Sequence, residues 1–488
     1  MSIPAGSIPQ LDELYVISDL HLGGTSGSQI FDAGEAAERF IQHLQTSSPE
    51  KRIALVINGD LVDFLAEPPA RHFDPVGAVD KLNRIVKDSS FEPVWTALKT
   101  FVATKNRCLV INLGNHDLEL ALPWVRARLL ELLTDDDEAA HARILLAFDG
   151  SGFLCRVGCA KILCVHGNEV DDWNLTDHER IRRLARDLVQ GRPLESWIPN
   201  AGTQLVIDVM NHLKSRYPFV DLLKPESQAV LPTLLALAPS DLRDKIVAAI
   251  AAAHRLARDK IRRASGLLGA VEEQDADEAP DAFQEAPFET AGSRQYAEEL
   301  LRKAEDRMTR NIDPMSLVAS DQRGGYLGRM DAVRSFFRGE PTSEILREAL
   351  EELAKDRSFD PTAEDDTFRR LDERIGDVDF LVAGHTHLER ALRRRSRSGW
   401  YFNTGTWARL IRIEPETLKD KEKFGRLYEA FDAGKMADLD QHPGLVLRRR
   451  TVAVFWKDGA GTKGQLQRVG QPEEPVLSEV PDSLFIRS

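Results

Sequence analysis

Five short apolar runs, each followed at once by polar or glycine-rich residues, constrain the fold more than any other feature of the sequence. Their length and β-branched content are typical of buried strands. Segments 33–45 and 91–103, which separate the first three runs, carry apolar residues at helical spacing, as in βα units. We therefore predict an α/β fold whose chemistry gathers beyond the carboxyl ends of the strands. The runs are LYVISDLH (14–21), RIALVINGD (52–60), RCLVINLGNHD (107–117), KILCVHGNE (161–169) and DFLVAGHTH (379–387).

The segment between the fourth and fifth runs has a different character. Residues 176–375 contain several helical patterns, and Thr176 with Glu179 forms a capping-box pattern at the start of the first. Residues 271–290 are acidic and poor in packing side chains, which is typical of an exposed or mobile linker. After His387 the pattern returns to strands. We predict a core of residues 1–175 and 376–488, with 176–375 as a helical insertion that either caps the site or mediates oligomerisation.

The composition excludes some classes of protein. A formal net charge of −14 argues against a strongly basic surface for nonspecific nucleic-acid binding. No apolar run approaches the roughly 20 residues that span a bilayer, and the first residues lack a basic start followed by an apolar stretch. We therefore expect a cytoplasmic protein without a membrane span. The four cysteines form no CxxC pair, so we expect buried thiols rather than a zinc or redox site: Cys108, Cys155, Cys159 and Cys164.

The polar residues at the run ends have the chemistry of metal ligands. Side chains i and i+2 of a strand share a face, so Asp19 and His21 are predicted to point together. Alone, this pair is more typical of a turn cap and a satisfied core histidine than of a functional site. The later runs add Asp60, Asn115, His116, Asp117, His166, His385 and His387, so that five of the twelve histidines of the chain lie in these short stretches.

Imidazole, carboxylate and amide ligands without thiolate suit a borderline or fairly hard transition metal such as Mn, Fe or Zn. The glycines in the same stretches allow the sharp turns that bring adjacent side chains inward. Seven candidate ligands exceed the needs of one tetrahedral ion. They suit two ions about 3.5 to 4 Å apart that share a bridging carboxylate, the arrangement that clamps both ends of a phosphoryl displacement.

The ordered set D-x-H, G-D-x-x-D, G-N-H-D, H-G and G-H-T-H resembles the calcineurin-like metallophosphoesterases. The resemblance covers roughly residues 12–175 and 376–410. It implies a four-layer α/β/β/α sandwich and a metal-dependent hydrolase of phosphoester or phosphodiester bonds. It also implies two divalent ions, Mn first with Fe or Zn as alternatives, and a metal-bridging hydroxide that attacks phosphorus. A small phosphodiester or nucleotide-type substrate is expected.

The same resemblance assigns roles residue by residue. The first metal would be held by Asp19, His21 and His387. The second would be held by Asn115, His166 and His385, with Asp60 bridging the two. His116 would stabilise the transition state or protonate the leaving oxygen, and Asp117 would orient its ring.

Within the superfamily, the motifs favour some branches over others. Protein phosphatases carry G-D-x-x-D-R-G and G-N-H-E, whereas this chain reads GDLVDFL and GNHDLE. Its SDLHLG and GNHD forms resemble those of Mre11-like nucleases and of small phosphodiesterases. They also resemble the pyrophosphohydrolases that cleave UDP-diacylglucosamine, although those usually carry Arg at the position of His116. The acidic net charge disfavours a nuclease. An Mre11-like nuclease, or a non-catalytic scaffold that uses the insertion, are the alternatives.

Three neighbouring features have two interpretations each. The arginine cluster ERALRRRSRSGWY, with Arg393, Arg394 and Arg395, either binds substrate phosphates or forms a solvated hairpin. Asn403 in FNTGTW either faces the site or shapes a turn. The pair of Asp171 and Asp172 either orients ligand histidines or begins a loop.

Overall fold

The computed structural model describes residues 8–27, 29–71, 73–171, 174–192 and 358–488, with scattered residues between 217 and 351. The chain divides into two compact units, the first formed by 1–194, 356–412 and 436–488 and the second by 195–355 and 413–435. Most of the predicted insertion, including the acidic stretch 271–290, lies outside the described residues. The predicted domain boundaries therefore stay a prediction.

The first unit contains an eight-stranded sheet in the order β15-β14-β13-β2-β3-β4-β5, with β16 also paired to β14. Its parallel part consists of β2 (Glu13–Ile17), β3 (Ile53–Asn58), β4 (Arg107–Asn112) and β5 (Ile144–Ala147). Its antiparallel part consists of β13 (Thr451–Asp458), β14 (Gly461–Val469), β15 (Leu477–Glu479) and β16 (Phe485–Arg487).

A six-stranded sheet in the order β1-β6-β7-β8-β10-β9 packs against it. Its strands are β1 (Gln10–Leu11), β6 (Phe153–Val157), β7 (Ala160–Cys164), β8 (Phe380–Ala383), β9 (Glu389–Arg393) and β10 (Trp400–Thr404). β7, β8 and β10 run parallel to one another, and β9 and β10 form a hairpin. A separate two-stranded ladder joins β11 (Leu410–Ile411) to β12 (Val446–Leu447). Each of the five apolar runs thus supplies a strand, as predicted.

The core lies between the two sheets. Val16, Ala54 and Val110 from the large sheet meet Ile162 and Phe402 from the small one, and all five are buried. β3 is buried along its whole length because both faces of its sheet are covered. This explains why its sequence reads as a continuous apolar run rather than an alternating one.

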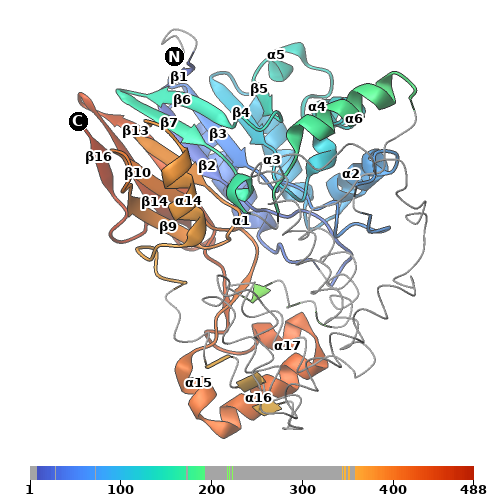
Figure 1. Cartoon of the computed structure of the whole chain (residues 1–488), viewed down its shortest axis with the longest axis vertical. Helices are drawn as coiled ribbons and strands as arrows, with labels where there is room; N and C mark the ends of the chain where they lie inside the picture. The colour runs from blue at the N-terminus through green and yellow to red at the C-terminus, as the bar shows by residue number, and fades with distance from the viewer. Residues whose placement is uncertain are drawn as a thin grey trace, which may run out of the picture. The chain divides into compact units, whose positions relative to one another are not determined.

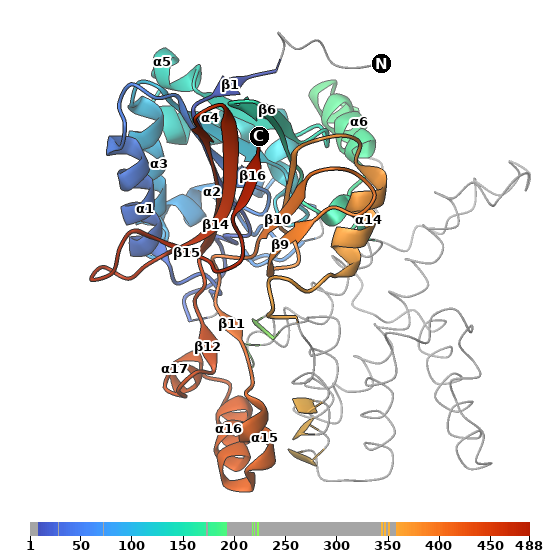
Figure 2. The ribbon, with the colours of Figure 1, turned by 90° about the vertical axis from the view of Figure 1, so that its left-hand side faces the viewer.

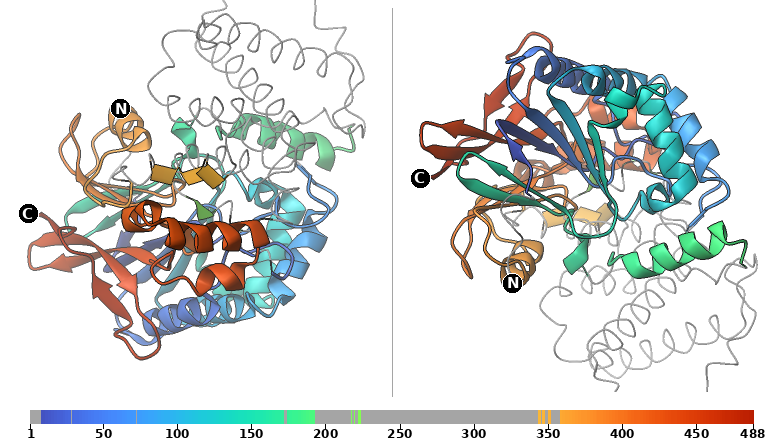
Figure 3. Two further views of the ribbon diagram at one scale, coloured as in Figure 1. Left: turned by 90° about the horizontal axis from the view of Figure 1, so that it is seen from below. Right: turned by 90° about the horizontal axis from the view of Figure 1, so that it is seen from above.

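Helices cover the two outer faces, as Figures 1 and 2 show. The large sheet carries α1 (Gly34–Thr46), α2 (Ala78–Lys87), α3 (Glu92–Ala103), α4 (Pro123–Thr134) and α5 (Glu138–His141). The ring of Phe40 on α1 lies 6.3 Å from that of Tyr15 on β2. On the small sheet, α14 (Asp366–Arg374) buries Phe368 and Leu371 against Leu381 and Tyr401. The first unit, seen end-on in Figure 3, is therefore the predicted four-layer α/β/β/α sandwich.

One helix start differs from the prediction. α6 (His178–Val189) is capped by Asp177, whose carboxylate accepts a hydrogen bond from the Arg180 N–H at 2.9 Å. The hydroxyl of Thr176 instead accepts a hydrogen bond from Asn168 Nδ2 at 2.9 Å. The capping-box interpretation of Thr176 was therefore wrong, because that hydroxyl is used by the loop before the helix.

The remaining elements are short. The second unit contains α15 (Pro415–Lys419) and α16 (Lys421–Ala433), in which Phe431 stacks on Phe219 with ring centroids 4.6 Å apart. α17 (Met436–Asp440) belongs to the first unit. Within the described ranges, no helix combines the length and apolar character needed to cross a membrane. All four cysteines are free; Cys155 and Cys164 are buried as expected, whereas Cys159, in the turn between β6 and β7, is exposed.

Candidate metal centre

The first motif lies beyond its strand rather than on it. β2 ends at Ile17, and the next residues run alongside the loop that follows β3: the Asp19 N–H donates to Gly59 O at 3.1 Å and the His21 N–H to Asp60 O at 2.9 Å. Asp19 and His21 have φ of 55° and 51°. Strand alternation was therefore the wrong reason for their common direction. They converge because both residues adopt the left-handed backbone conformation in a loop.

The left-handed conformation recurs at the other predicted ligands. Asp60, His385 and His387 have φ of 52°, 69° and 62°. A side chain in this region costs roughly 1 to 2 kcal/mol, and such strain is typical of functional sites. Five of the seven predicted ligands thus have a strained backbone. The surrounding structure, rather than local backbone preference, holds them in this conformation.

Asp19, His21 and His387 form the first cluster of donor atoms. Nε2 of His21 lies 3.0 Å from Nε2 of His387, and the latter lies 3.3 Å from Asp19 Oδ1. Asp19 and His21 are buried, and the side chain of His387 is 12% exposed. Two imidazole nitrogens and a carboxylate oxygen therefore face a common point, and the three residues form one of the groups that could hold an ion.

Asp60 links this cluster to the next. Its Oδ2 lies 3.7 Å from His21 Nε2 and 3.2 Å from His166 Nε2. His166 is buried, and its Nδ1 donates to the carbonyl oxygen of Asn58 at 2.8 Å, which leaves Nε2 facing Asp60. Asp60 accordingly belongs to two groups that could hold an ion, one with His21 and His116 and one with Asp19 and His166.

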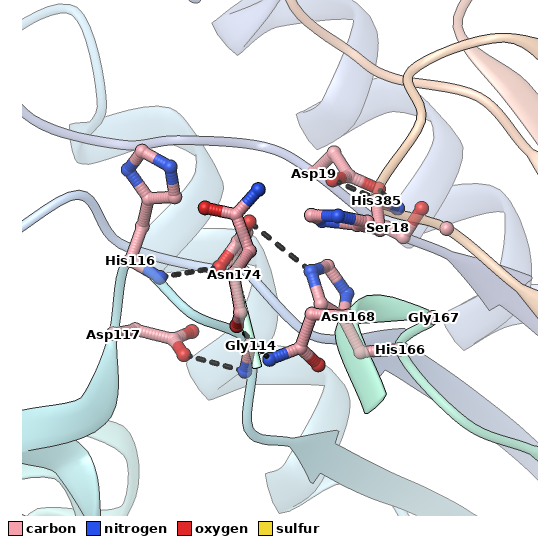
Figure 4. A network of polar contacts seen from close by, with 12 residues as sticks. Ser18, Asp19, Gly114, His116, Asp117, His166, Gly167, Asn168, Asn174 and His385 are labelled. Atoms are coloured by element: carbon pink, nitrogen blue, oxygen red, sulfur yellow. Dashed lines mark hydrogen bonds and ion pairs between the residues drawn. The ribbon is translucent and has the colours of Figure 1, made fainter. Parts of the chain in front are cut away.

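His385 and Asn115 complete the predicted set. Nε2 of His385 lies 2.8 Å from Asp171 Oδ2, which leaves Nδ1 as its candidate ligand atom, and its ring lies 5.4 Å from that of His166. A carboxylate on the second nitrogen is the usual support of a ligand histidine, so this contact agrees with the orienting role considered for Asp171. Asp172 lies outside the described residues. Figure 4 shows His166 and His385 with Asp19 on one side of the network and His116 with Asp117 on the other.

The donor set fits a metal ion. The amide oxygen Oδ1 of Asn115 is buried and has no hydrogen-bond partner within the described ranges. A buried polar atom without a partner costs free energy, which a bound cation would recover. The gathered donors are nitrogen and oxygen atoms without thiolate, as Mn, Fe or Zn accepts.

The electrostatics agree with this fit. Burial opposes ionisation of Asp19, but the hydrogen bond to His387 and the charge of His166 lower its pKa to about 2. Burial likewise opposes ionisation of Asp60, and His166 and His116 hold its pKa well below the usual value. Burial works against protonation of His166, yet Asp60 raises the pKa of its imidazole to about 10. The carboxylates thus stay ionised, and the positive charge of protonated His166 balances them where a bound metal ion would otherwise do so.

His116 lies beside this cluster and is oriented by a residue that the sequence interpretation missed. Its Nδ1 is 3.1 Å from Asp63 Oδ2, which also lies 3.4 Å from Nδ1 of His21. Asp117 instead accepts hydrogen bonds from the backbone N–H groups of Gly114 at 2.7 Å and Leu61 at 2.9 Å. The expected orienting role of Asp117 is therefore corrected: its carboxylate holds two loops, and Asp63, the second aspartate of G-D-x-x-D, contacts the ring.

Two glycines allow these loops to approach closely. A Cβ on Gly59, whose φ is 90°, would lie 2.2 Å from Nδ1 of His166. A Cβ on Gly114 would lie 2.1 Å from Asp60 Oδ1. Both contacts are too short for any side chain, so these positions require glycine.

A model of the calcineurin-like phosphoesterase family matches residues 13–254. The chain belongs to the calcineurin-like phosphoesterases. Members of this family are metal-dependent phosphoester hydrolases, so this protein is an enzyme of that class. The matched range ends before β8, and the fold brings His387 into one of the groups that could hold an ion, whereas His385 belongs to none of these groups among the described residues. No curated protein matches the sequence.

The arginine cluster of this phosphoesterase lies away from the centre. Arg393 pairs with Trp400, which pairs with Phe380 at the start of β8, whereas His385 follows the end of that strand. The strand from Phe380 to Ala383 spans about 10 Å, and His385 lies beyond its end. This register corrects the expectation that Arg393, Arg394 and Arg395 contact substrate.

The contacts of these arginines explain why they are present. Arg394 is buried, and its guanidinium donates to Asp372 Oδ1 at 2.8 Å and to the carbonyl oxygens of Ile375 and Gly376 just beyond α14. Arg395 forms an ion pair with Glu364, and Arg393 is exposed. The cluster thus anchors the end of α14 to the hairpin of β9 and β10.

Asn403 lies at the correct end of its strand but faces the loop rather than open space. Its Nδ2 donates to Gly384 O at 2.7 Å and to Thr386 Oγ1 at 3.1 Å, and its Oδ1 accepts from the Gly405 N–H at 2.9 Å. The phosphoesterase therefore uses Asn403 to shape the G-H-T-H loop. This corrects the expected substrate contact and agrees with the turn interpretation.

Proposed function

We propose that this phosphoesterase is a dinuclear enzyme that hydrolyses a small phosphodiester or a nucleotide-type substrate. The position of Asp60 carries the proposal. Its Oδ2 lies within 3.7 Å of His21 Nε2 and 3.2 Å of His166 Nε2, so one carboxylate is shared by two sets of donors. Asp19, His21 and His387 would hold one ion, and Asn115, His166 and His385 the other.

The chemistry divides between the ions and the chain. Two bound divalent ions would supply positive charge to the phosphate and lower the pKa of a water nucleophile. His116 is the imidazole beside Asp60 that is partly exposed, with 18% of its side chain accessible, so it can reach a substrate oxygen. It would donate a proton to the leaving oxygen or stabilise charge on the phosphoryl group, while Asp63 holds its ring.

The charge of the chain supports a small substrate. A long polyanion binds through many phosphate contacts to basic side chains, and the net charge of this chain is −14. Arg393 on β9 is level with Phe380, at the end of the sheet opposite to the G-H-T-H loop. A phosphodiester or nucleotide needs few such contacts, because two bound ions would neutralise most of its charge.

Metal analysis and a matched pair of substrates test the proposal. We expect about two transition ions per purified chain and hydrolysis of bis-p-nitrophenyl phosphate with Mn²⁺. Asp60→Asn should lower the metal content and abolish activity, whereas Asp80→Asn, at an exposed position on α2, should change neither. A single ion per chain with full activity would contradict a dinuclear site.

A panel of natural substrates then decides the substrate class. Cyclic nucleotides, nucleotide diphosphates, single-stranded DNA and phosphopeptides should be compared by kcat/KM at equal metal loading. We expect the highest value for a cyclic nucleotide or nucleotide diphosphate. A preference for DNA would favour the nuclease alternative instead.

A further inference from the structure

Two buried amide side chains stand between the sheets directly below the candidate metal centre. Asn58 and Asn112 are the last residues of β3 and β4, and both are almost completely buried. The interior beside them is apolar, with Val56, Val110 and Cys164 among its members. Polar groups in such a position require a specific arrangement of partners.

The partners of both amides include the end of β7. Asn112 Nδ2 donates to Asn58 Oδ1 at 2.6 Å and to Cys164 O at 3.1 Å. Asn58 Nδ2 donates to Val165 O at 2.7 Å. The two residues before His166 are thus fastened to the opposite sheet.

The ring of His166 is held by Asn58 as well. Its Nδ1 contacts Asn58 O at 2.8 Å, and a carbonyl oxygen only accepts, so Nδ1 carries the hydrogen. In the neutral ring, Nε2 is then the free donor of an electron pair, as a metal ligand must be. Asn58 therefore fixes the position of His166 through its side chain and the tautomer through its main chain.

A second polar pair joins the sheets on the other side of the centre. Ser18, directly before Asp19, places its hydroxyl 2.6 Å from that of Thr404 on β10, and its oxygen lies 3.2 Å from Gly405 O. Thr404 Oγ1 donates to Ala383 O at 3.4 Å, at the end of the strand that leads into the G-H-T-H loop. This pair links the segment of Asp19 to β8 and β10, and β8 leads into the loop that carries His387 and also His385.

We propose that these two pairs are positioning residues that hold the two halves of the metal centre separately: Asn58 with Asn112 acts on the half with His166, and Ser18 with Thr404 on the half with Asp19 and His387. The inference rests on the proposed dinuclear function. Stability alone does not account for the amides, because Asn112 Oδ1 is buried without a hydrogen-bond partner within the described ranges. An apolar pair of similar size would avoid that cost, although Cys164 O and Val165 O would lose these donors.

Metal binding to the full-length apoprotein tests the inference without reference to activity. Titration calorimetry with Mn²⁺ should show that Asn112→Leu weakens one of two binding events by about 10- to 100-fold and leaves the other unchanged. Thr404→Val should weaken the other event, and Thr404→Ser, which keeps the hydroxyl, should restore it. If the leucine variant does not fold, Asn112→Ala replaces it in the same titration.

Double variants assign each event to its half. Asn112→Leu should add little to His166→Ala but should add its full effect to His387→Ala, and the reverse should hold for Thr404→Val. Ser483→Ala, which removes a buried hydroxyl bonded to Leu466 and Val480, should lower the urea midpoint without changing either event.

The outcomes separate the two proposals. Fewer than two ions bound by the wild-type chain would overturn the proposed function itself. Two ions in the wild-type chain, with Asn112→Leu and Thr404→Val each weakening both events equally or neither event, would overturn only the positioning roles.

Discussion

The carboxylate of Asp63 lies 3.1 Å from Nδ1 of His116, the imidazole proposed to act on the leaving oxygen. An imidazole contributes to proton transfer only when its ring is correctly oriented, and general acid catalysis is typically worth 10²- to 10⁴-fold. We predict that Asp63→Asn lowers kcat by about 10- to 100-fold with little change in KM, measured under saturating Mn²⁺.

The double variant with His116→Ala supplies the control for that prediction. Once the ring is absent, the loss caused by Asp63→Asn should largely disappear. Asp117→Asn should instead lower stability, because it holds the backbone of Gly114 and Leu61. Equal and additive effects of the two aspartates on kcat would contradict the assignment of ring orientation to Asp63.

Gly59→Ala should disable the half of the centre that contains His166. The added methyl would lie 2.2 Å from Nδ1 of that ring and would sit on a backbone with φ of 90°. We expect loss of about one bound metal ion and most of the activity, measured by metal analysis after size-exclusion chromatography. Gly425→Ala on α16, where nothing lies within 4 Å, is the matched control and should leave both unchanged. A Gly59→Ala variant with full metal content would argue against close packing at this loop.

Arg394→Ala should affect stability rather than catalysis. Removal of its guanidinium leaves the buried carboxylate of Asp372 without an ionic partner and the carbonyl oxygens beyond α14 without donors. Breaking a buried pair costs about 3 to 5 kcal/mol. Urea unfolding should report that loss with KM unchanged, whereas Arg393→Ala at the exposed end of β9 should change neither quantity. An increase in KM for either variant would restore the substrate-binding interpretation.

Glu119 should make stability depend on pH. It lies in the short helix Leu118–Ala121, is buried, and accepts a hydrogen bond from the Asp74 N–H at 3.0 Å. Burial raises the pKa of its carboxyl from 4.5 to about 7. The folded state favours the protonated form of Glu119. The contribution of this carboxyl to stability is therefore present below about pH 4.5 and is lost as the pH rises through about 7.

Glu119→Gln keeps the acceptor and removes the charge. The variant should match the wild type at pH 4 and exceed its free energy of unfolding by about 3 kcal/mol at most at pH 8, measured by urea unfolding. Glu429→Gln at an exposed position on α16 should show no such dependence. Equal stability of variant and wild type at both pH values would show that Glu119 ionises without cost.

The sequence predicts the strands and the ligand residues, but not the local geometry that brings them together. Apolar β-branched runs identify β2, β3 and β4 because both faces of their sheet are covered. The left-handed backbone at Asp19 and His385 leaves no trace in residue type, because neither is glycine. The metal-binding roles themselves stay predictions.

The errors at the arginines and at Asp117 have a different origin. Proximity in sequence placed Arg393 near His387, but β9 runs back along β10 and carries the arginine to the far end of the sheet. Asp117 follows His116 directly in the sequence, yet the ring of His116 contacts Asp63, which lies in the loop after β3. Contacts made between loops of different strands depend on register, which a single sequence does not reveal.

The pairing of β2 has a consequence for folding during synthesis of the chain. On one side β2 pairs with β3, and on the other it pairs with β13, where Val16 lies opposite Ala453. The strand that leads to Asp19 is therefore an open edge until more than four hundred further residues have been synthesised. A nascent chain released early would display an unpaired, apolar strand, so it should depend on chaperones during translation. The set of proposed ligands is complete only after His387 has left the ribosome.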